Sequence, residues 1–199
     1  MRFGAKAELR PMRAYLELLC MGAAFLLLET MNVVRFALYF GTTWLVNALV
    51  FAGILASVYL AVDVARRFTL PRTVVLYGLL FVALGVTFAV PPEALLGLPV
   101  AVRFVAASVV AFAPVFMANL VFAQRFREVG NSTVAFGANL LGAMLGGVLE
   151  YASISLGYRN LLVIVAVLYA SALVLGRRQL GGEKSKETAV ARDAVVPTG

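Results

Sequence analysis

The sequence predicts an all-α integral membrane protein with six transmembrane helices. Six apolar stretches of about 20 residues follow one another, and each is long enough to cross a hydrocarbon core of about 30 Å. Hydrophobic residues make up 62% of the 199 residues, which leaves no room for a sizeable water-soluble domain. Charge collects in the breaks between these stretches. The expected spans are 13–34, 42–64, 73–91, 98–122, 132–152 and 160–176.

The distribution of basic residues predicts the orientation of these spans. All 17 Lys and Arg residues except Arg35, Arg103 and Arg159 lie near the N-terminus, after the second and fourth stretches, or after the sixth. Loops rich in Lys and Arg stay in the cytoplasm, so we expect both termini there. The residues that determine this topology are Arg66, Arg67, Arg125, Arg127, Arg177 and Arg178.

Glycine and proline mark the expected ends of the helices. The first helix is expected to continue to about Phe40 and to turn at Gly41. Pro71 marks the first turn of the third helix, and the two prolines at 91–92 end it. Pro114 lies inside the fourth helix and is expected to bend it.

The chain is expected to divide into three parts. Residues 1–12 form a basic cytoplasmic segment, 13–178 form the six-helix transmembrane domain, and 179–199 form a mobile polar cytoplasmic tail. The first apolar stretch is too long for a signal peptide, and no small-x-small cleavage site follows it. We therefore interpret it as a retained span.

Composition excludes several classes of function. The chain has no histidine, and Cys20 is its single cysteine, so we expect no haem, zinc or iron–sulfur cofactor and no metal site. The formal charge of +7 is explained by topology, because the basic residues cap helices and do not form a nucleic-acid-binding stripe. No nucleophile–base pair, phosphate loop or dinucleotide fingerprint is present, so catalysis by this chain has little support.

Charged residues inside the spans are the first candidates for function. A charge near the bilayer centre costs about 2.5–3.5 kcal/mol on insertion scales, so each needs a partner or a purpose. We expect five of them in the outer third of the membrane, where they form an ion-pair lattice between helix ends or a gated site for a polar solute. Snorkelling to the interface is a third interpretation. These residues are Glu29, Arg35, Arg103, Glu150 and Arg159.

Intramembrane amides and small residues are the second group of candidates. Asn47, Asn119 and Asn139 are expected to form hydrogen bonds between helices, with a solute-lining role as the alternative. Small residues recur every four positions along 132–152, which is typical of close helix packing, and packing within this chain is favoured over a dimer interface. The helix that packs there is also expected to touch Glu150. The packing residues are Ala138, Gly142, Gly146 and Gly147.

Two passages resemble a known family. Residues 25–30 and 40–47 (FLLLET and FGTTWLVN) form the first, and residues 137–151 (GANLLGAMLGGVLEY), continuing to Gly157-Tyr-Arg159, form the second. Both resemble the C-terminal membrane region of bacterial membrane-bound spermidine-synthase-like proteins, in which a major-facilitator-like part is fused to an aminopropyltransferase domain. The resemblance covers most of residues 15–178.

The resemblance implies half of a major-facilitator-type bundle, in a bacterial inner membrane, with both termini inside. The aminopropyltransferase domain has no counterpart in this sequence, so the resemblance does not extend to aminopropyl transfer. Met31 stands where the relatives often have a lysine, which weakens the case for a local Glu–Lys pair. The motif positions carried over are Glu29, Asn47, Asn139 and Glu150.

Three functions remain open from the sequence. The favoured one is an assembly or anchoring subunit of a larger membrane complex. The second is a half-transporter that works as a dimer and moves a small polar or cationic solute. The third is a membrane anchor for a separate polyamine-type enzyme. The expected partners are the lipid bilayer, with anionic lipids at the juxtamembrane arginines, and other membrane subunits or a second copy of the chain.

Overall fold

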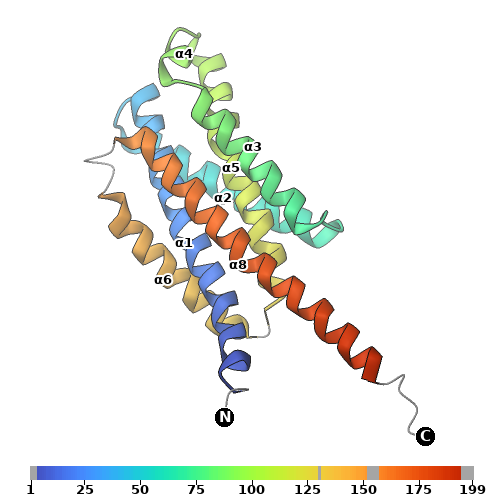
Figure 1. Ribbon diagram of the computed structural model, residues 1–199. Helices are drawn as coiled ribbons and strands as arrows, with labels where there is room; N and C mark the ends of the chain where they lie inside the picture. The colour runs from blue at the N-terminus through green and yellow to red at the C-terminus, as the bar shows by residue number, and fades with distance from the viewer. Residues whose placement is uncertain (1–3, 130, 152–156, 194–199) are drawn as a thin grey trace, which may run out of the picture.

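The computed structural model describes residues 4–129, 131–151 and 157–193, and Figure 1 shows that they form a bundle of helices. Helix accounts for 88% of the structure, and the described residues contain no strand. The helices are α1 (Gly4–Phe40), α2 (Trp44–Arg67), α3 (Thr73–Ala89), α4 (Pro92–Leu96), α5 (Val100–Arg127), α6 (Ser132–Glu150) and α8 (Tyr158–Asp193).

The length and composition of the helices indicate a membrane-embedded, multi-pass protein. Five described helices are long and apolar enough to cross a membrane, namely α1, α2, α5, α6 and α8. The remaining apolar helix, α3, has 17 residues. At 1.5 Å per residue it measures about 26 Å, which is close to the thickness of a hydrocarbon core.

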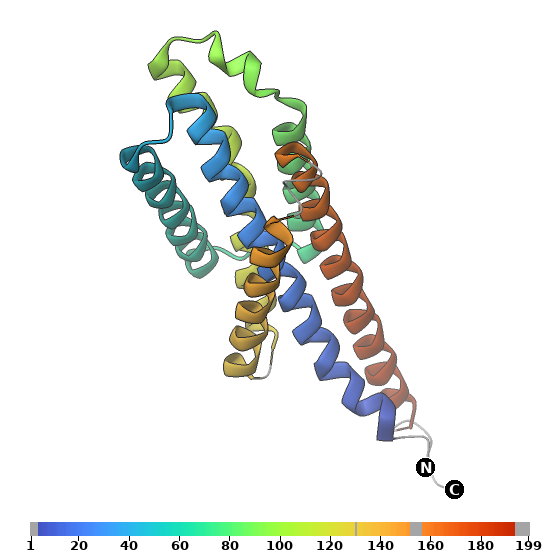
Figure 2. The same cartoon turned by 90° about the vertical axis from the view of Figure 1, so that its left-hand side faces the viewer.

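Helix α1 is the centre of the bundle. It contacts α2, α4, α5, α6 and α8, while α5 also packs on α2 and α3, and α3 packs on α8. Figure 2 shows α1 running the length of the molecule between α2 on one side and α8 on the other. The start of α1 and the end of α8 lie at the same end of the bundle, opposite α4 (Figures 1 and 2). Side chains of α1 therefore face nearly every other helix.

The first turn of the chain follows the sequence prediction. Helix α1 ends at Phe40, and Gly41 adopts a φ of 91°, a conformation that favours glycine. The hydroxyl of Thr43 then caps α2 by accepting a hydrogen bond from the Val46 N–H (3.3 Å). The predicted end of the first helix and its turn are confirmed.

Several helical segments extend beyond the sequence prediction, including α2, which ends at Arg67 where 64 was expected, and α5, which ends at Arg127 where 122 was expected. A single turn, α4, begins at Pro92 with Pro91 as its N-cap, because proline is tolerated in the first turn of a helix. Helix α1 already begins at Gly4, within the expected basic segment. Helix α8 continues to Asp193, into the region for which a mobile tail is expected. Residues 194–199 of that region lie outside the described residues.

Candidate functional site

A buried salt bridge joins α1 to the end of α5. Arg125 donates from Nε to Glu17 Oε1 (2.6 Å) and from Nη2 to Glu17 Oε2 (2.5 Å). The exposed fractions are 2% for Glu17 and 5% for Arg125. This two-point pairing is the strongest geometry available to an arginine and a carboxylate. Arg125 also pairs with Glu128, which is exposed just beyond the last turn of α5.

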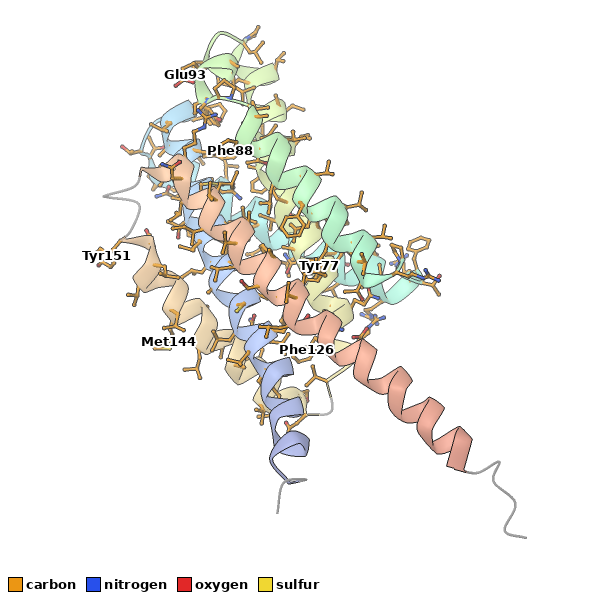
Figure 3. The ribbon with its side chains drawn as sticks, viewed as in Figure 1. Tyr77, Phe88, Glu93, Phe126, Met144 and Tyr151 are labelled. Atoms are coloured by element: carbon orange, nitrogen blue, oxygen red, sulfur yellow. The ribbon has the colours of Figure 1, made fainter. Side chains whose placement is uncertain are left out.

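Four helices meet at this ion pair. Helix α8 crosses directly over it at Gly176, where a Cβ would lie 2.8 Å from both Arg125 Nη2 and Glu17 Oε1. A residue larger than glycine at this position would force the side chains of the ion pair to shift. Tyr77 of α3, labelled in Figure 3, lines the same small cavity of about 10 Å³. The sequence marked Arg125 as a topology determinant but did not predict that it pairs with Glu17.

A second polar cluster surrounds the proline inside α5. Proline has no N–H, so Pro114 leaves the carbonyl of Val110, four residues earlier, without its helical donor. The Thr87 hydroxyl of α3 donates to that carbonyl at 2.9 Å and shares its hydrogen with the Ala83 carbonyl at 2.8 Å. At the next residue, Asn32 of α1 donates from Nδ2 to the Ala111 carbonyl (3.1 Å).

Loss of the Thr87 hydroxyl is expected to destabilise this cluster. Thr87→Val should lower the free energy of unfolding by about 1 kcal/mol, in the range measured for hydrogen bonds between membrane helices. Pro114→Ala restores an N–H for the Val110 carbonyl, so Thr87→Val should cost less in that background. Thermal unfolding of the two single variants and the double variant in detergent measures this coupling. An equal cost in both backgrounds would contradict the assigned role of Thr87.

The arginines predicted for the outer side bind the C-terminal ends of helices. Arg35, with an exposed fraction of 2%, donates to the Thr87 carbonyl near the end of α3 (2.8 Å). Arg103 donates to the Leu96 carbonyl in α4 at 2.7 Å and to the Tyr39 carbonyl in α1 at 3.2 Å. The last carbonyls of a helix lack helical partners and carry partial negative charge, so a guanidinium group stabilises them.

Arg159 continues this pattern on α8. Its Nη2 lies 3.4 Å from the Phe88 carbonyl oxygen, and its guanidinium carbon lies 4.7 Å from the centroid of the Phe88 ring. The sequence predicts that these arginines form an outer lattice of ion pairs or a gated polar site. At Arg103 and Arg159 the described residues show bonds to helix ends instead, because free carbonyls lie within reach there.

The carboxylates of that expected lattice have other neighbours. Glu150 accepts a hydrogen bond from the Thr30 hydroxyl of α1 (3.3 Å). Glu29 is half-buried on α1, and no salt bridge joins it to another described residue. The salt bridges between described residues involve other groups. Arg125 pairs with Glu17 and with Glu128, and Arg67 pairs with Asp63.

The structure brings two of the three intramembrane amides together. Asn119 of α5 and Asn139 of α6 line one cavity of about 90 Å³, together with Tyr169 of α8. Asn119 also donates to the Val115 carbonyl of its own helix (2.8 Å). Asn47 is exposed on α2 and does not line this cavity. The remaining lining residues are Met21, Phe25, Ala118 and Phe122.

The small residues of α6 pack on α1 of the same chain. A Cβ at Gly142 would overlap the Leu19 carbonyl, and a Cβ at Gly146 would lie 2.6 Å from the Ala23 carbonyl oxygen. A Cβ at Gly147 would meet only the side chain of Leu26, at 3.4 Å. Ala138, on the same helix, is half-buried. Helix α1 also carries Thr30, so the same neighbour contacts Glu150.

The basic residues near the helix ends differ in their surroundings. Arg127 of α5 donates to the Ala65 carbonyl of α2 (2.6 Å), which brings the ends of these helices together. Arg67 pairs with Asp63 on its own helix (2.8 Å), and Arg66 is exposed. Arg177 and Arg178 lie on α8, where only the backbone is described.

Comparisons with protein-family models, curated proteins and solved structures found no match to this chain. Within the part of the chain that the structure describes, no group of three or more His, Cys, Asp or Glu side chains could hold a metal ion. The candidate site therefore consists of the Glu17–Arg125 pair, the cluster around Pro114, and the cavity between Asn119 and Asn139.

Proposed function

We propose that this chain is a multi-pass membrane subunit that anchors or assembles a larger membrane complex. The main support is that its buried polar side chains bind other parts of the same bundle. Glu17 is occupied by Arg125, and Asn32 and Thr87 are occupied by carbonyls of α5. The polar cavity between Asn119 and Asn139 measures about 90 Å³, which is room for a few water molecules. Polar side chains that are used for bonds within the bundle suit an assembly role better than a transport cycle, in which such bonds would have to break.

The topology of the subunit is part of this proposal. We infer six crossings, with α3 as the sixth, both termini in the cytoplasm, and a location in a bacterial inner membrane. The bond from Arg127 to the Ala65 carbonyl supports this, since it joins the ends of α2 and α5 that precede the two basic loops. The likeness to half of a major-facilitator-type bundle, and to the spermidine-synthase-like membrane region, belongs to the same proposal.

Helix α6 provides a surface for a partner. It packs on α1 through its glycines and leaves a broad apolar face exposed, on which Figure 3 labels Met144. Lipid tails or the helices of another subunit can cover such a face. Its exposed large side chains are Val134, Phe136, Leu140, Leu141, Met144, Leu145, Val148 and Leu149.

A half-transporter that works as a dimer is the second candidate. The cavity between α1, α5, α6 and α8 favours it, since two amides and Tyr169 converge there. Polar groups inside a membrane often mark the path of a solute. A second copy of the chain would have to enlarge this space into a continuous path for a small polar or cationic solute.

Purification from native expression levels in a mild detergent tests the proposed function. The assembly role predicts that unrelated membrane subunits co-purify in fixed stoichiometry. A monodisperse homodimer without other chains would contradict it and favour the transporter. A stoichiometric soluble enzyme of the aminopropyltransferase type would favour the third function, a membrane anchor for that enzyme.

Neutralising the intramembrane carboxylates separates the first two functions. For the assembly role, Glu29→Gln and Glu150→Gln should lower the amount of assembled complex, because each removes a charge that can bind a partner helix. Blue-native electrophoresis of membranes measures this amount. Glu93→Gln, at an exposed position on α4, is the control and should behave like the unchanged protein. Unchanged assembly together with abolished solute uptake would contradict the assembly role.

A further inference from the structure

An apolar groove runs between α3 and α8. The two helices lie side by side (Figures 1 and 3), and the space between them measures about 250 Å³. Its lining is apolar almost throughout. The side chains and the glycine that line it are Phe81, Leu84, Gly85 and Phe88 from α3 and Leu162, Val163 and Ala166 from α8.

Gly85 helps to keep this groove open. No atom lies within 4 Å of the position that a Cβ would take there, in contrast to Gly142, which is packed against a neighbouring helix. Across the groove, Ala166 also has a small side chain. No protein side chain fills the groove, so in the proposed membrane location it is open to the surrounding lipid. A long apolar chain of small cross-section suits a space of this shape.

A positive charge stands at one end of the groove. Arg159 lies one turn before Leu162 and Val163 on α8, and its guanidinium group stacks on Phe88, which lines the groove. Arg159 is exposed and forms no salt bridge with any described carboxylate. Phe88 is the penultimate residue of α3, and Arg159 is the second residue of α8. The charge therefore lies at the helix ends, at the depth of lipid headgroups.

We propose that this groove binds one acyl chain of an anionic phospholipid, with the headgroup phosphate on Arg159. An acyl chain gains little from leaving the lipid phase for an apolar groove, since lipid tails are as apolar as the groove itself. Selectivity must then come from the headgroup. A guanidinium group binds phosphate oxygens in a two-point geometry, and basic pockets between membrane helices are known sites for anionic headgroups. Arg159 contacts the Phe88 carbonyl and ring and has no carboxylate partner among the described residues, so an anionic headgroup would complement its charge where an apolar helix would not.

Native mass spectrometry of the full-length protein in detergent tests this site. The protein is titrated with phosphatidylglycerol and with phosphatidylethanolamine that have the same acyl chains. One phosphatidylglycerol molecule should be retained in preference to phosphatidylethanolamine. The preference should be about fivefold, as expected for the attraction of one juxtamembrane charge. Arg159→Gln should abolish the preference, while Arg66→Gln, at an exposed arginine elsewhere, should leave it unchanged.

A second pair of variants tests the groove itself. Gly85→Phe fills the space and should remove the retained lipid. Gly78→Phe, at another open glycine of α3 that does not line the groove, should keep it. Equal retention of both lipids, together with an unchanged pattern in Arg159→Gln, would overturn the proposal. Dimers that dissociate in Gly85→Phe would overturn it as well, because the groove would then be a subunit interface. If Gly85→Phe fails to fold, the result for Arg159→Gln decides.

Discussion

Replacing Arg125 with methionine is expected to destabilise the protein by about 3–5 kcal/mol. The change leaves the Glu17 carboxylate buried without its partner, and an uncompensated buried charge is among the most costly defects in a folded protein. Thermal unfolding in detergent, followed by tryptophan fluorescence, should show an earlier transition, and the amount of protein in the membrane should fall.

A double variant separates the ion pair from general damage to the site. Glu17→Met combined with Arg125→Met removes both charges, and replacing a buried pair by apolar side chains is often neutral or stabilising. The double variant should therefore unfold close to the unchanged protein. Arg67→Gln, which breaks an exposed pair with Asp63, should change stability by less than about 1 kcal/mol. A double variant as unstable as Arg125→Met would contradict this explanation.

Substitution of Gly142 by alanine is expected to have the second large effect. The added methyl group would overlap the main-chain carbonyl of Leu19, and a backbone carbonyl cannot move aside without shifting the whole helix. Overpacking of this kind costs about 1–3 kcal/mol and sometimes more. The unfolding temperature in detergent should fall, and crosslinking between cysteines placed on α1 and α6 should weaken.

The same helix offers a matched control. Gly137 has no atom within 4 Å of the position that a Cβ would take, so Gly137→Ala adds a methyl group to open space. That variant should be neutral or slightly stabilising, because alanine favours helix over glycine. If both alanine variants unfold alike, the close packing of α6 on α1 is not a determinant of stability.

Local sequence signals predicted the helices but not their partners. Long apolar stretches predicted the helices that can cross a membrane, and Gly41 predicted the first turn, because both depend on neighbouring residues. The pairing of Glu17 with Arg125 spans 108 positions of the chain, and a single sequence carries no signal for such a distance. The sequence signal that pointed toward this pair was the presence of Glu17 inside the first apolar stretch.

The polar cluster around Pro114 illustrates a second limit. The sequence indicated that this proline disturbs its helix, and from this a free carbonyl at Val110 could have been predicted. It could not indicate that Thr87 supplies the donor, or that Asn32 binds the next carbonyl, since both depend on how α1, α3 and α5 pack. At Arg103 and Arg159 the described residues show bonds to helix ends, which the expected ion-pair lattice did not include, for a related reason. The backbone carbonyls at helix ends accept hydrogen bonds from these arginines, and a prediction based on charged residues alone does not include them.

The central claim is that the basic loops of this helical bundle share one side of a membrane, and thiol labelling tests it most directly. In a Cys20→Ala background, single cysteines at Thr69 and Ser132 would report the loops after α2 and α5, and cysteines at Thr42 and Gly97 would report the opposite end. An impermeant maleimide added to intact cells should label Thr42→Cys and Gly97→Cys and spare Thr69→Cys and Ser132→Cys. Labelling of Thr69→Cys and Ser132→Cys from opposite sides would contradict the claim.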